Sequence, residues 1–470
     1  MIILLAVSII ILWLLQYLRY NVTHNNKDNI YTAMRIIHTS DWHLGQYFYG
    51  KSRANEHQQF LNWLLAQVTK HKVDALIVAG DIFDTGTPPS YAREMYFDFI
   101  AKITQLSCQL ILLAGNHDSV AMLAESKQLL ASLAVTVMPT ISANIEEQVI
   151  AIKNKQGQPE ALLCAIPFIR PRDVLTSQAG QSAKTKQQNL QQAISKHYQA
   201  SYKHALAYRA SLENKIIPII ATGHLTTVGV TTSESVRDIY IGTLEAYPAS
   251  AFPPADYIAL GHIHKAQKVA KSEHIRYCGS PIALSFDEAK QEKQVLLVDF
   301  EDDKFQQTTA LTVPTFQPLA MVKTSLEQLV HDVEQLVVQQ QTFLADNKNA
   351  KVWLDIEIES ADYLQDLQAK INHLIEDLPI EILLVRRSKK ARRLMTQSED
   401  KTTLSELTLA EVFDKRLDVE MWQTAEQLAQ KKRITDIFQK VAFSLDSLAV
   451  VENAKGEDDK TGHVKAGLNK

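Results

Sequence analysis

Aspartate, asparagine and histidine recur in five short motifs, each placed directly after an apolar run. In four of them a glycine precedes the polar residue, which lets the backbone turn sharply and bring the side chain into a shared crevice. Oxygen and nitrogen ligands without cysteine favour Mn, Fe or Zn over a thiolate-type structural zinc. The motifs are Asp41-x-His43, Gly80-Asp81-x-x-Asp84, Gly115-Asn116-His117-Asp118, Gly223-His224 and Gly261-His262-x-His264.

These motifs supply enough ligands for two metal ions that share one carboxylate. Two ions about 3.5–4 Å apart can clamp the attacking and leaving oxygens of an in-line phosphoryl displacement and activate water near neutral pH. A single Gly-His is more often structural, and "GDIFD" alone could begin a helix. Five such motifs at strand ends favour a two-metal phosphoesterase instead. The candidate ligands are Asp41, His43, Asp81, Asn116, His224, His262 and His264.

Alternating strands and helices are predicted to position the first motifs. Apolar runs at 35–39, 75–79 and in "QLILLAGNHDS" read as buried strands, and helical periodicity marks 55–70 and 90–106. This spacing predicts right-handed βαβ units on a helix-covered sheet, whose sites lie at the carboxyl ends of the strands. "IIPIIATGHLT" and "DYIALGHIHKAQ" repeat the strand-to-loop pattern. Residues 176–214, rich in Gln, Lys and Ala, are predicted to be largely helical and solvent-facing.

The sequence changes character after about Val313. Alternating apolar residues at 352–358 predict a strand, Ser360 can begin a helix, and 380–385 form a second strand. This βαβ unit indicates a small α+β domain to about residue 395, which ends in the basic run "RRSKKARR" at 386–393. Two amphipathic helices are expected between about 405 and 446. The tail, 451–470, has few bulky apolar groups and is expected to be disordered.

Composition allows several domains and a sizeable core in a chain of 470 residues with 46% hydrophobic content. The formal net charge of −4 gives no bulk attraction to nucleic acid, so an anionic partner requires a local patch or metal ions. Only three cysteines occur, Cys108, Cys164 and Cys278, without CxxC spacing. Buried thiols in a reducing compartment are therefore expected.

The first segment, 1–33, differs from the rest. Residues 2–18 are almost wholly apolar, and as a helix they would span roughly 26 Å, slightly less than a hydrocarbon core of about 30 Å. No Lys or Arg precedes the run, which disfavours a signal peptide. Two interpretations stay open: a membrane anchor, or translated sequence upstream of a start at Met34. We favour the second, because the first strand begins at Met34.

From 34 to about 448 the sequence resembles the calcineurin-like metallophosphoesterase superfamily, whose pattern is DxH…GDxxD…GNHD…GH…GHxH. Within it, the SbcD family of nuclease subunits is most similar, through "MRIIHTSDWHLGQ", "GDIFDTGTPP", "AGNHDS", "SESVRDIYIGTLEAYPASAFPPADYIALGHIHKAQ" and "YCGSPIALSFDE". The resemblance implies an α/β fold: a four-layer sheet sandwich flanked by helices (34–312), a small α+β capping domain (313–395) and a C-terminal helix pair (396–450).

The resemblance also implies roles for individual residues. His117 would be catalytic and face the scissile phosphate, where it stabilises charge or protonates the leaving oxygen; a structural role for this ring is the alternative. Asp84 would hold the His117 ring, and Asp118 would fix the turn. Two Mn²⁺ ions are implied, one held by Asp41, His43, Asp81 and His264, the other by Asp81, Asn116, His224 and His262.

The implied activity is ATP-dependent 3′-to-5′ exonuclease action on double-stranded ends and endonuclease action on single strands and hairpins, in DNA repair, replication and recombination. This chain has no G-x-x-x-x-G-K-[ST] motif, so ATP would bind the ATPase partner SbcC, in a heterotetramer in the cytoplasm at the nucleoid. The helix pair would dock on the SbcC coiled coil or pack on its own capping domain. Residues 386–393 would contact DNA phosphates or form a solvated basic face.

Two other functions compete with this interpretation. One is a stand-alone phosphomonoesterase or cyclic-nucleotide phosphodiesterase that uses the same metals. The second is a non-catalytic scaffold that tethers SbcC, with residues 2–18 as a membrane anchor. The capping domain and helix pair argue against the first, and the intact ligand set argues against the second.

Overall fold

The computed structural model describes residues 34–387, except 155, 176–181, 213–215, 237–245, 302–303, 348–349 and 360–366, together with 413, 416–417, 422, 427 and 429–438. The chain divides into two units, Met1–Ala391 and Arg392–Lys470, and each is considered by itself. The apolar segment 2–18, the basic residues 388–393, most of the predicted helix pair and the tail lie outside the described residues.

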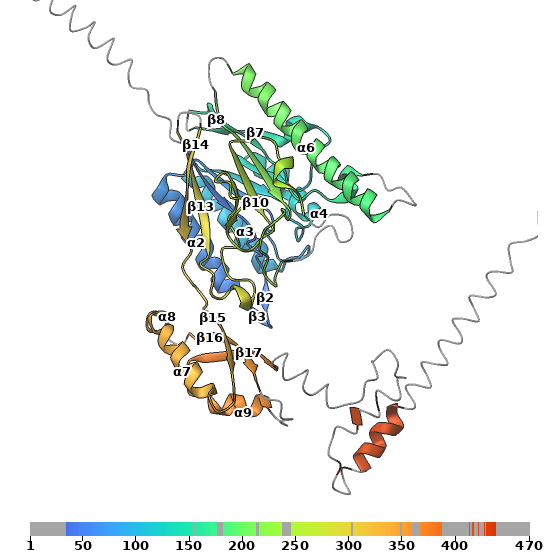
Figure 1. Ribbon diagram of the computed structural model, residues 1–470. Coiled ribbons are helices and arrows are strands. Elements are labelled where there is room, and N and C mark those ends of the chain that lie inside the picture. Colours follow the sequence, from blue (N-terminus) through green and yellow to red (C-terminus); the bar gives the residue numbers. More distant parts are fainter. Residues whose placement is uncertain are drawn as a thin grey trace, which may run out of the picture. The chain divides into compact units, whose positions relative to one another are not determined.

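The first of two six-stranded sheets carries the first three motifs (Figure 1). Its order is β14-β13-β1-β4-β5-β6, in which β1, β4, β5 and β6 run parallel and β13 pairs antiparallel with both β1 and β14. Parallel neighbours place their carboxyl ends at one edge of the sheet. The strands are β1 (Met34–Thr39), β4 (Ala75–Ala79), β5 (Gln109–Leu113), β6 (Val135–Met138), β13 (Gln294–Glu301) and β14 (Lys304–Thr312).

The second sheet carries the remaining two motifs. Its order is β11-β12-β10-β9-β8-β7, with β12, β10, β9 and β8 parallel and an antiparallel strand at each edge. Its strands are β7 (Val149–Lys153), β8 (Pro159–Cys164), β9 (Ile219–His224), β10 (Tyr257–Gly261), β11 (Gln267–Lys268) and β12 (Ile275–Tyr277).

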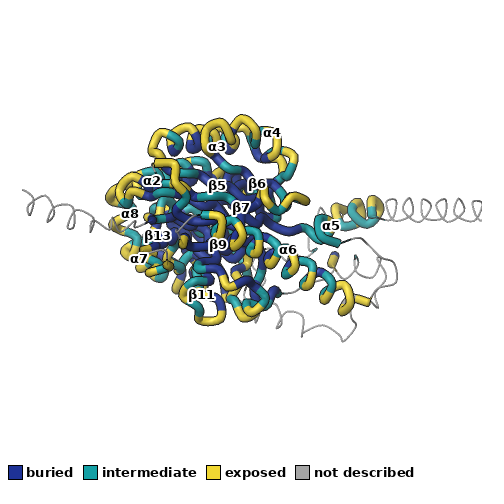
Figure 2. The backbone as a smooth tube through the Cα atoms, turned by 90° about the horizontal axis from the view of Figure 1, so that it is seen from above, coloured by how far each residue is buried: buried dark blue, intermediate teal, exposed yellow. Residues whose placement is uncertain are grey.

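Alternate residues of each strand lie on opposite faces of its sheet, so one set packs between the sheets and the other packs under the helices. Ile36, Ile77 and Ile111 belong to a core between the two sheets, which also contains Ile220 from the second sheet. The intervening side chains of the first sheet pack under α2, α3 and α4, and those of the second under α6. Figure 2 shows the buried strands between helices that are exposed on their outer sides. The fold is the expected four-layer sandwich. The helices are α2 (Ala54–His71), α3 (Ser90–Ile103), α4 (Val120–Ala131), α5 (Pro171–Val174) and α6 (Ala183–Ser211).

The helix α6 differs from its prediction in one respect. It is helical as expected, but it is not solvent-facing throughout: Leu190, Ile194 and Tyr198 are fully or almost fully buried against the second sheet. Their spacing of four residues places them on one stripe of the helix. The surrounding Gln and Lys residues concealed this stripe in the composition.

A third, smaller sheet follows within the same unit. β15, β16 and β17 are all parallel, and α7 contacts β15. The strands at 352–358 and 380–385 were predicted, whereas β15 and α7 were not. The elements are β15 (Leu319–Thr324), α7 (Leu329–Gln339), α8 (Gln341–Asp346), β16 (Val352–Ile358), α9 (Leu367–Leu374) and β17 (Ile380–Arg387).

Aromatic contacts join this third sheet to the loops of the sandwich. The Trp353 ring stacks on Phe48 of the hairpin β2 (Tyr47–Phe48) and β3 (Lys51–Ser52), with 5.9 Å between centroids and 9° between planes. Phe286, in the 3-10 helix Phe286–Glu288, and Leu319 complete the cluster. At the end of β17, Arg386 donates to the buried Asp355 over 3.1 Å. This arginine of the basic run is therefore engaged in a structural ion pair.

Three smaller features concern the cysteines, the second unit and membrane-spanning helices. All three cysteines are free and buried, as expected. In the second unit the Phe413 and Phe438 rings, one from each predicted C-terminal helix, stack with centroids 3.7 Å apart. Within the part of the chain that the structure describes, no helix has the length and apolarity needed to cross a membrane.

A buried histidine links the two sheets. His38 on β1 lies 3.0 Å from the Tyr257 hydroxyl and 3.1 Å from the Leu260 carbonyl, both on β10. A carbonyl oxygen only accepts, so Nε2 carries the proton and Nδ1 accepts from the tyrosine. Burial lowers the pKa of His38 to about 3 despite the carbonyl contact.

This histidine should make the folded protein acid-sensitive. Above about pH 6.5 the ring is neutral in both states, whereas between about pH 6.5 and 3 only the unfolded chain takes up the proton, so the free energy of unfolding falls by roughly 1.4 kcal/mol per pH unit. His57, whose pKa burial also lowers to about 3, adds to this slope. We expect urea unfolding midpoints of His38→Gln to depend less on pH between 7 and 5 than those of the parent. His331→Gln, on an exposed position of α7, should leave the slope unchanged; an unchanged slope in His38→Gln would contradict the assignment.

Candidate metal centre

The loops after five parallel strands meet at one edge of the sandwich. β1, β4 and β5 of the first sheet lead into the first three motifs, and β9 and β10 of the second sheet lead into the last two. Backbone hydrogen bonds connect neighbouring loops: Asp41 N–H donates to the Gly80 carbonyl over 2.9 Å, and His43 N–H donates to the Asp81 carbonyl over 3.1 Å. Asp41 also accepts from the His262 N–H over 3.0 Å, which joins the two sheets at the site.

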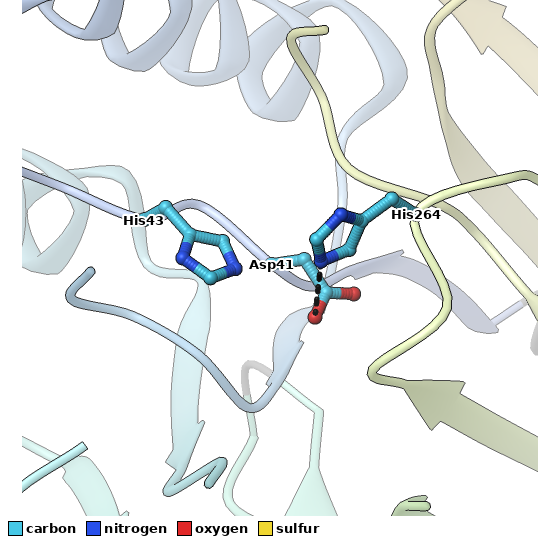
Figure 3. Close-up of side chains that lie close together, drawn as sticks. All are labelled: Asp41, His43 and His264. Atoms are coloured by element: carbon cyan, nitrogen blue, oxygen red, sulfur yellow. Dashed lines mark ion pairs between the residues drawn. The ribbon is translucent and has the colours of Figure 1, made fainter. Parts of the chain in front are cut away.

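The predicted ligands gather in two groups whose ligand atoms lie within 4.8 Å of one another. The first contains Asp41, His43 and His264, which converge in Figure 3; His264 Nε2 lies 3.9 Å from Asp41 Oδ1. Asp81 joins the second group and is also grouped with His43 and His117, so it lies between the two positions. All of these side chains except His117 are buried. The second group is Asp81, His224 and His262.

Unpaired nitrogen atoms indicate what the site accommodates. His43 Nε2 and His262 Nε2 are buried and have no hydrogen-bond partner, a costly arrangement for a polar atom. The Asn116 amide oxygen lies 3.0 Å from His224 Nε2 and 3.1 Å from His262 Nδ1. Lone pairs of neutral imidazoles and carboxylate oxygens are suitable ligands for divalent metals. The residues present therefore fit metal ions.

The charges in the site also favour a cation. Burial by itself would raise the pKa of Asp81, but the nearby His224 and His43 hold it well below its usual range. Burial opposes protonation of His224, but the Asp81 charge 3.2 Å away raises the pKa of this ring to about 9. Burial and the adjacent His224 hold the pKa of His262 well below its usual range. Because a metal ion competes with the His224 proton, metal binding should weaken as the pH falls.

The backbone at the site is held in an uncommon conformation. Asp41, His43, Asp81 and His262 have φ values of 55°, 48°, 50° and 91°, in the left-handed region. Each such non-glycine residue costs on the order of 1–3 kcal/mol and persists only where the surrounding structure enforces it. Nothing in the local sequence signals this conformation, which occurs at residues from the loops after β1, β4 and β10 that meet at the same centre.

The glycines of the motifs serve two different purposes. Gly80 has φ +97°, so the sharp turn expected of these residues occurs here. The other three do not adopt positive φ and are needed for close approach: a Cβ on Gly115 would lie 2.1 Å from Asp81 Oδ1, and one on Gly261 would lie 2.0 Å from the Ala79 carbonyl oxygen. The turn explanation therefore holds only for Gly80.

Asp118 fixes the turn, as expected. Its carboxylate accepts from the N–H groups of Gly115, Ile82 and Phe83 over 2.8, 3.1 and 2.9 Å. Burial, assisted by the nearby Asp81, raises the pKa of Asp118 to about 6 even though these donors oppose the shift. Asp118 thus ties the loop after β5 to the loop after β4 and stands outside the ligand groups.

Asp84 and His117 lie together at the edge of the ligand groups. His117 Nδ1 lies 2.7 Å from the backbone carbonyl of Asp84, whereas the Asp84 carboxylate lies 3.0 Å from His43 Nδ1. The backbone of Asp84 thus holds the His117 ring and its side chain contacts a candidate metal ligand. His117 N–H donates to Asp81 Oδ1 over 2.8 Å, and its ring meets that of His43 edge-on with centroids 4.6 Å apart.

Sequence reasoning missed the polar groups behind His264. Ser235 Oγ lies 2.6 Å from His264 Nδ1, and the buried Glu288 carboxylate contacts Ser235 and Lys293. Ser235 and Glu288 both lie within stretches that carry the family resemblance, "SESVRDIY" and "SFDE". No metal-ligand spacing distinguishes them, so only the fold could connect them with the site.

Comparison with known proteins agrees with this site. Residues 34–266 match the calcineurin-like phosphoesterase family, and residues 315–421 match the family described as the Type 5 capsule protein repressor C-terminal domain. The chain is 52% identical over 394 residues to the D subunit of nuclease SbcCD from Escherichia coli (strain K12), a match that covers 84% of this chain and 95% of the relative. The corresponding SbcCD nuclease protein of Rhodobacter capsulatus is 29% identical over 393 residues, 81% of this chain and 94% of the relative.

Among solved structures, a dimetal phosphatase from Danio rerio aligns with 60% of this chain and 99% of its own, with a TM-score of 0.33 and 12% identity, a likeness too weak to bear on function. The extended identity to the bacterial nuclease proteins, by contrast, spans the sandwich and continues beyond it. The chain belongs to the SbcD family, the D subunits of SbcCD nucleases, and carries a calcineurin-like phosphoesterase domain.

Proposed function

We propose that this chain is the nuclease subunit of an SbcCD-type complex and hydrolyses DNA phosphodiester bonds at a centre of two divalent ions, with Mn²⁺ as the ion used. The observation that carries this proposal is the convergence of the motif side chains from two sheets around His43 Nε2 and His262 Nε2, which have no hydrogen-bond partner. The proposed ligands are Asp41, His43, Asp81 and His264 for one ion, and Asp81, Asn116, His224 and His262 for the other.

The ions would supply Lewis acidity at the scissile phosphate and a nucleophile derived from water. His117 is the proposed catalytic histidine. Its Nδ1 must donate to the Asp84 carbonyl, because that oxygen only accepts. In the imidazolium form, Nε2 carries the second proton, which it can donate to the leaving oxygen. The Asp81 carboxylate lies beside this residue and accepts from its backbone N–H over 2.8 Å.

The remaining parts of the chain are proposed to serve DNA access and assembly. Residues 34–312 would form the nuclease domain, and 313–395 a capping domain, a proposal that the packing of Trp353 on Phe48 supports. Residues 396–450 would bind SbcC, which holds the ATP, in a heterotetramer at the nucleoid in the cytoplasm. Salt-sensitive DNA binding would support phosphate contacts by the basic run 386–393, in which Arg386 also pairs with Asp355.

Reconstitution of the full chain with its SbcC partner tests the proposal. With Mn²⁺ and ATP, we expect cleavage of hairpin and blunt-ended duplex DNA, loss of cleavage on metal removal with EDTA, and recovery on addition of Mn²⁺. The chain without SbcC serves as the control for ATP dependence. Rapid Mn²⁺-dependent hydrolysis of small phosphomonoesters without any DNA cleavage would instead establish a small-molecule phosphoesterase.

A further inference from the structure

A buried carboxylate lies directly behind the candidate ligand His264. Glu288 is fully buried and accepts from several groups drawn from three segments of the chain. Its Oε1 accepts from Ser233 over 2.7 Å, from Ser285 over 3.1 Å and from Ser235. Its Oε2 accepts from Lys293 over 2.5 Å and from the Leu284 N–H over 3.0 Å. A buried charge with this number of donors is a built feature of the fold.

Ser235 connects this carboxylate to the imidazole, and Glu288 Oε1 itself lies 3.4 Å from His264 Nδ1, farther from it than the Ser235 hydroxyl. Its Oγ lies 2.6 Å from His264 Nδ1 and contacts Glu288 Oε1. A hydroxyl donates only one proton, and an ionised carboxylate can only accept, so Ser235 donates to Glu288 and accepts from the His264 Nδ1–H. This assignment leaves the lone pair of His264 on Nε2, the nitrogen that lies 3.9 Å from Asp41 Oδ1.

Lys293 fixes the same histidine from its backbone side. The half-buried Lys293 donates from Nζ to the His264 carbonyl over 3.1 Å and to Ser280 over 2.9 Å, while it pairs with Glu288. The amine compensates the carboxylate charge and holds the main chain of His264 in place. Both the ring and the backbone of this residue are therefore fixed by groups bound to Glu288.

We propose that Glu288 is a positioning residue for His264 and acts through Ser235: it selects the Nδ1–H tautomer, directs Nε2 toward the first metal position and so sets the affinity of that position. The inference deepens the proposed function, because it rests on the metal site proposed there. The other histidines are oriented differently, His224 by the Ala79 carbonyl over 2.9 Å and His43 by Asp84. Loss of the Glu288 connection should therefore affect one metal position selectively. Partners of this kind typically change metal affinity by about 10–100-fold.

The test is Mn²⁺ binding to the full chain, measured by titration calorimetry and by electron paramagnetic resonance of the bound ions. For Ser235→Ala we expect about a 10–100-fold loss of affinity at one position and an unchanged second position. Ser235→Thr should restore binding, since it keeps the hydroxyl. Ser285→Ala is the matched control, because Ser285 donates to the same Glu288 oxygen over 3.1 Å, whereas the Ser233 hydroxyl lies 3.1 Å from Ser235 Oγ and is coupled to it. Cleavage by Ser235→Ala should fall at limiting Mn²⁺ and recover at high Mn²⁺.

Two further outcomes separate this inference from a merely structural role. Wild-type affinity at both positions in Ser235→Ala, or an equal loss in Ser285→Ala, would overturn it. Glu288→Gln should reproduce the selective loss; if this variant does not fold because Lys293 is left uncompensated, Ser235→Ala decides. The binding titration needs no nuclease activity, so absence of DNA cleavage with two bound ions and a selective effect of Ser235→Ala would contradict only the proposed function.

Discussion

Asp81→Asn is expected to lose both metal ions and to cleave DNA on the order of 10³-fold more slowly than the parent chain. The carboxylate lies between the two ligand groups, 3.2 Å from His224 Nε2 and 3.7 Å from His43 Nε2. Asparagine keeps the size of the side chain and an oxygen that can accept from the His117 N–H, so the loop after β5 should stay in place. Removal of the charge should therefore act on the ions rather than on the fold.

Metal content after dialysis, measured by mass spectrometry, checks this expectation. Asp299→Asn is a suitable control, since it removes the same charge from a carboxylate that pairs with Arg35 and lies outside the motifs. Retention of one tightly bound ion in Asp81→Asn would show that Asp81 serves one position only, and retention of two would refute its role as a bridge.

His117→Ala is expected to keep both metal ions and to lose about 10²–10⁴-fold in DNA cleavage. The ring is only partly buried, and its Nδ1 is held at the Asp84 carbonyl, which fixes its orientation at the edge of the metal centre. If the chain were a non-catalytic scaffold, this substitution would not change its function. The measurements are Mn²⁺ stoichiometry and the cleavage rate of the complex with SbcC and ATP, with His331→Ala as a control on an exposed histidine.

The choice of substrate identifies the role of His117. If the ring protonates the leaving oxygen, a substrate with a p-nitrophenolate leaving group, which departs without a proton, should lose much less rate in His117→Ala than DNA does. Equal losses on both substrates would indicate that the ring stabilises charge on the phosphate. Loss of an ion together with activity would instead support the structural alternative for this residue.

Local sequence patterns determined much of the sandwich. The predicted strand at 75–79 coincides with β4, and the predicted helix at 90–106 corresponds to α3 followed by the 3-10 turn Thr104–Leu106. The first is a continuous apolar run and the second has apolar residues at helical spacing, and both are properties of neighbouring residues. The smaller elements β15 and α7 were not predicted.

Pairing across long sequence separations could not be predicted in the same way. The contact between the Asp84 carboxylate and His43 depends on how the loops after β1 and β4 lie against each other. The burial of Leu190 on α6 depends on which face of the second sheet receives that helix. Apolar periodicity predicts single helices and strands. It does not predict which elements pack against each other.

The sequence by itself determined which residues could hold metal. Five short motifs place Asp, Asn and His directly after apolar strands, and these residue types are metal ligands. Only the tertiary structure decided how they meet. Two sheets packed through a shared hydrophobic core bring His224, His262 and His264 close to Asp41 and Asp81. The left-handed backbone of four site residues and the contact of Glu288 with Ser235 exist only in the folded chain, since packing from distant segments is what enforces them.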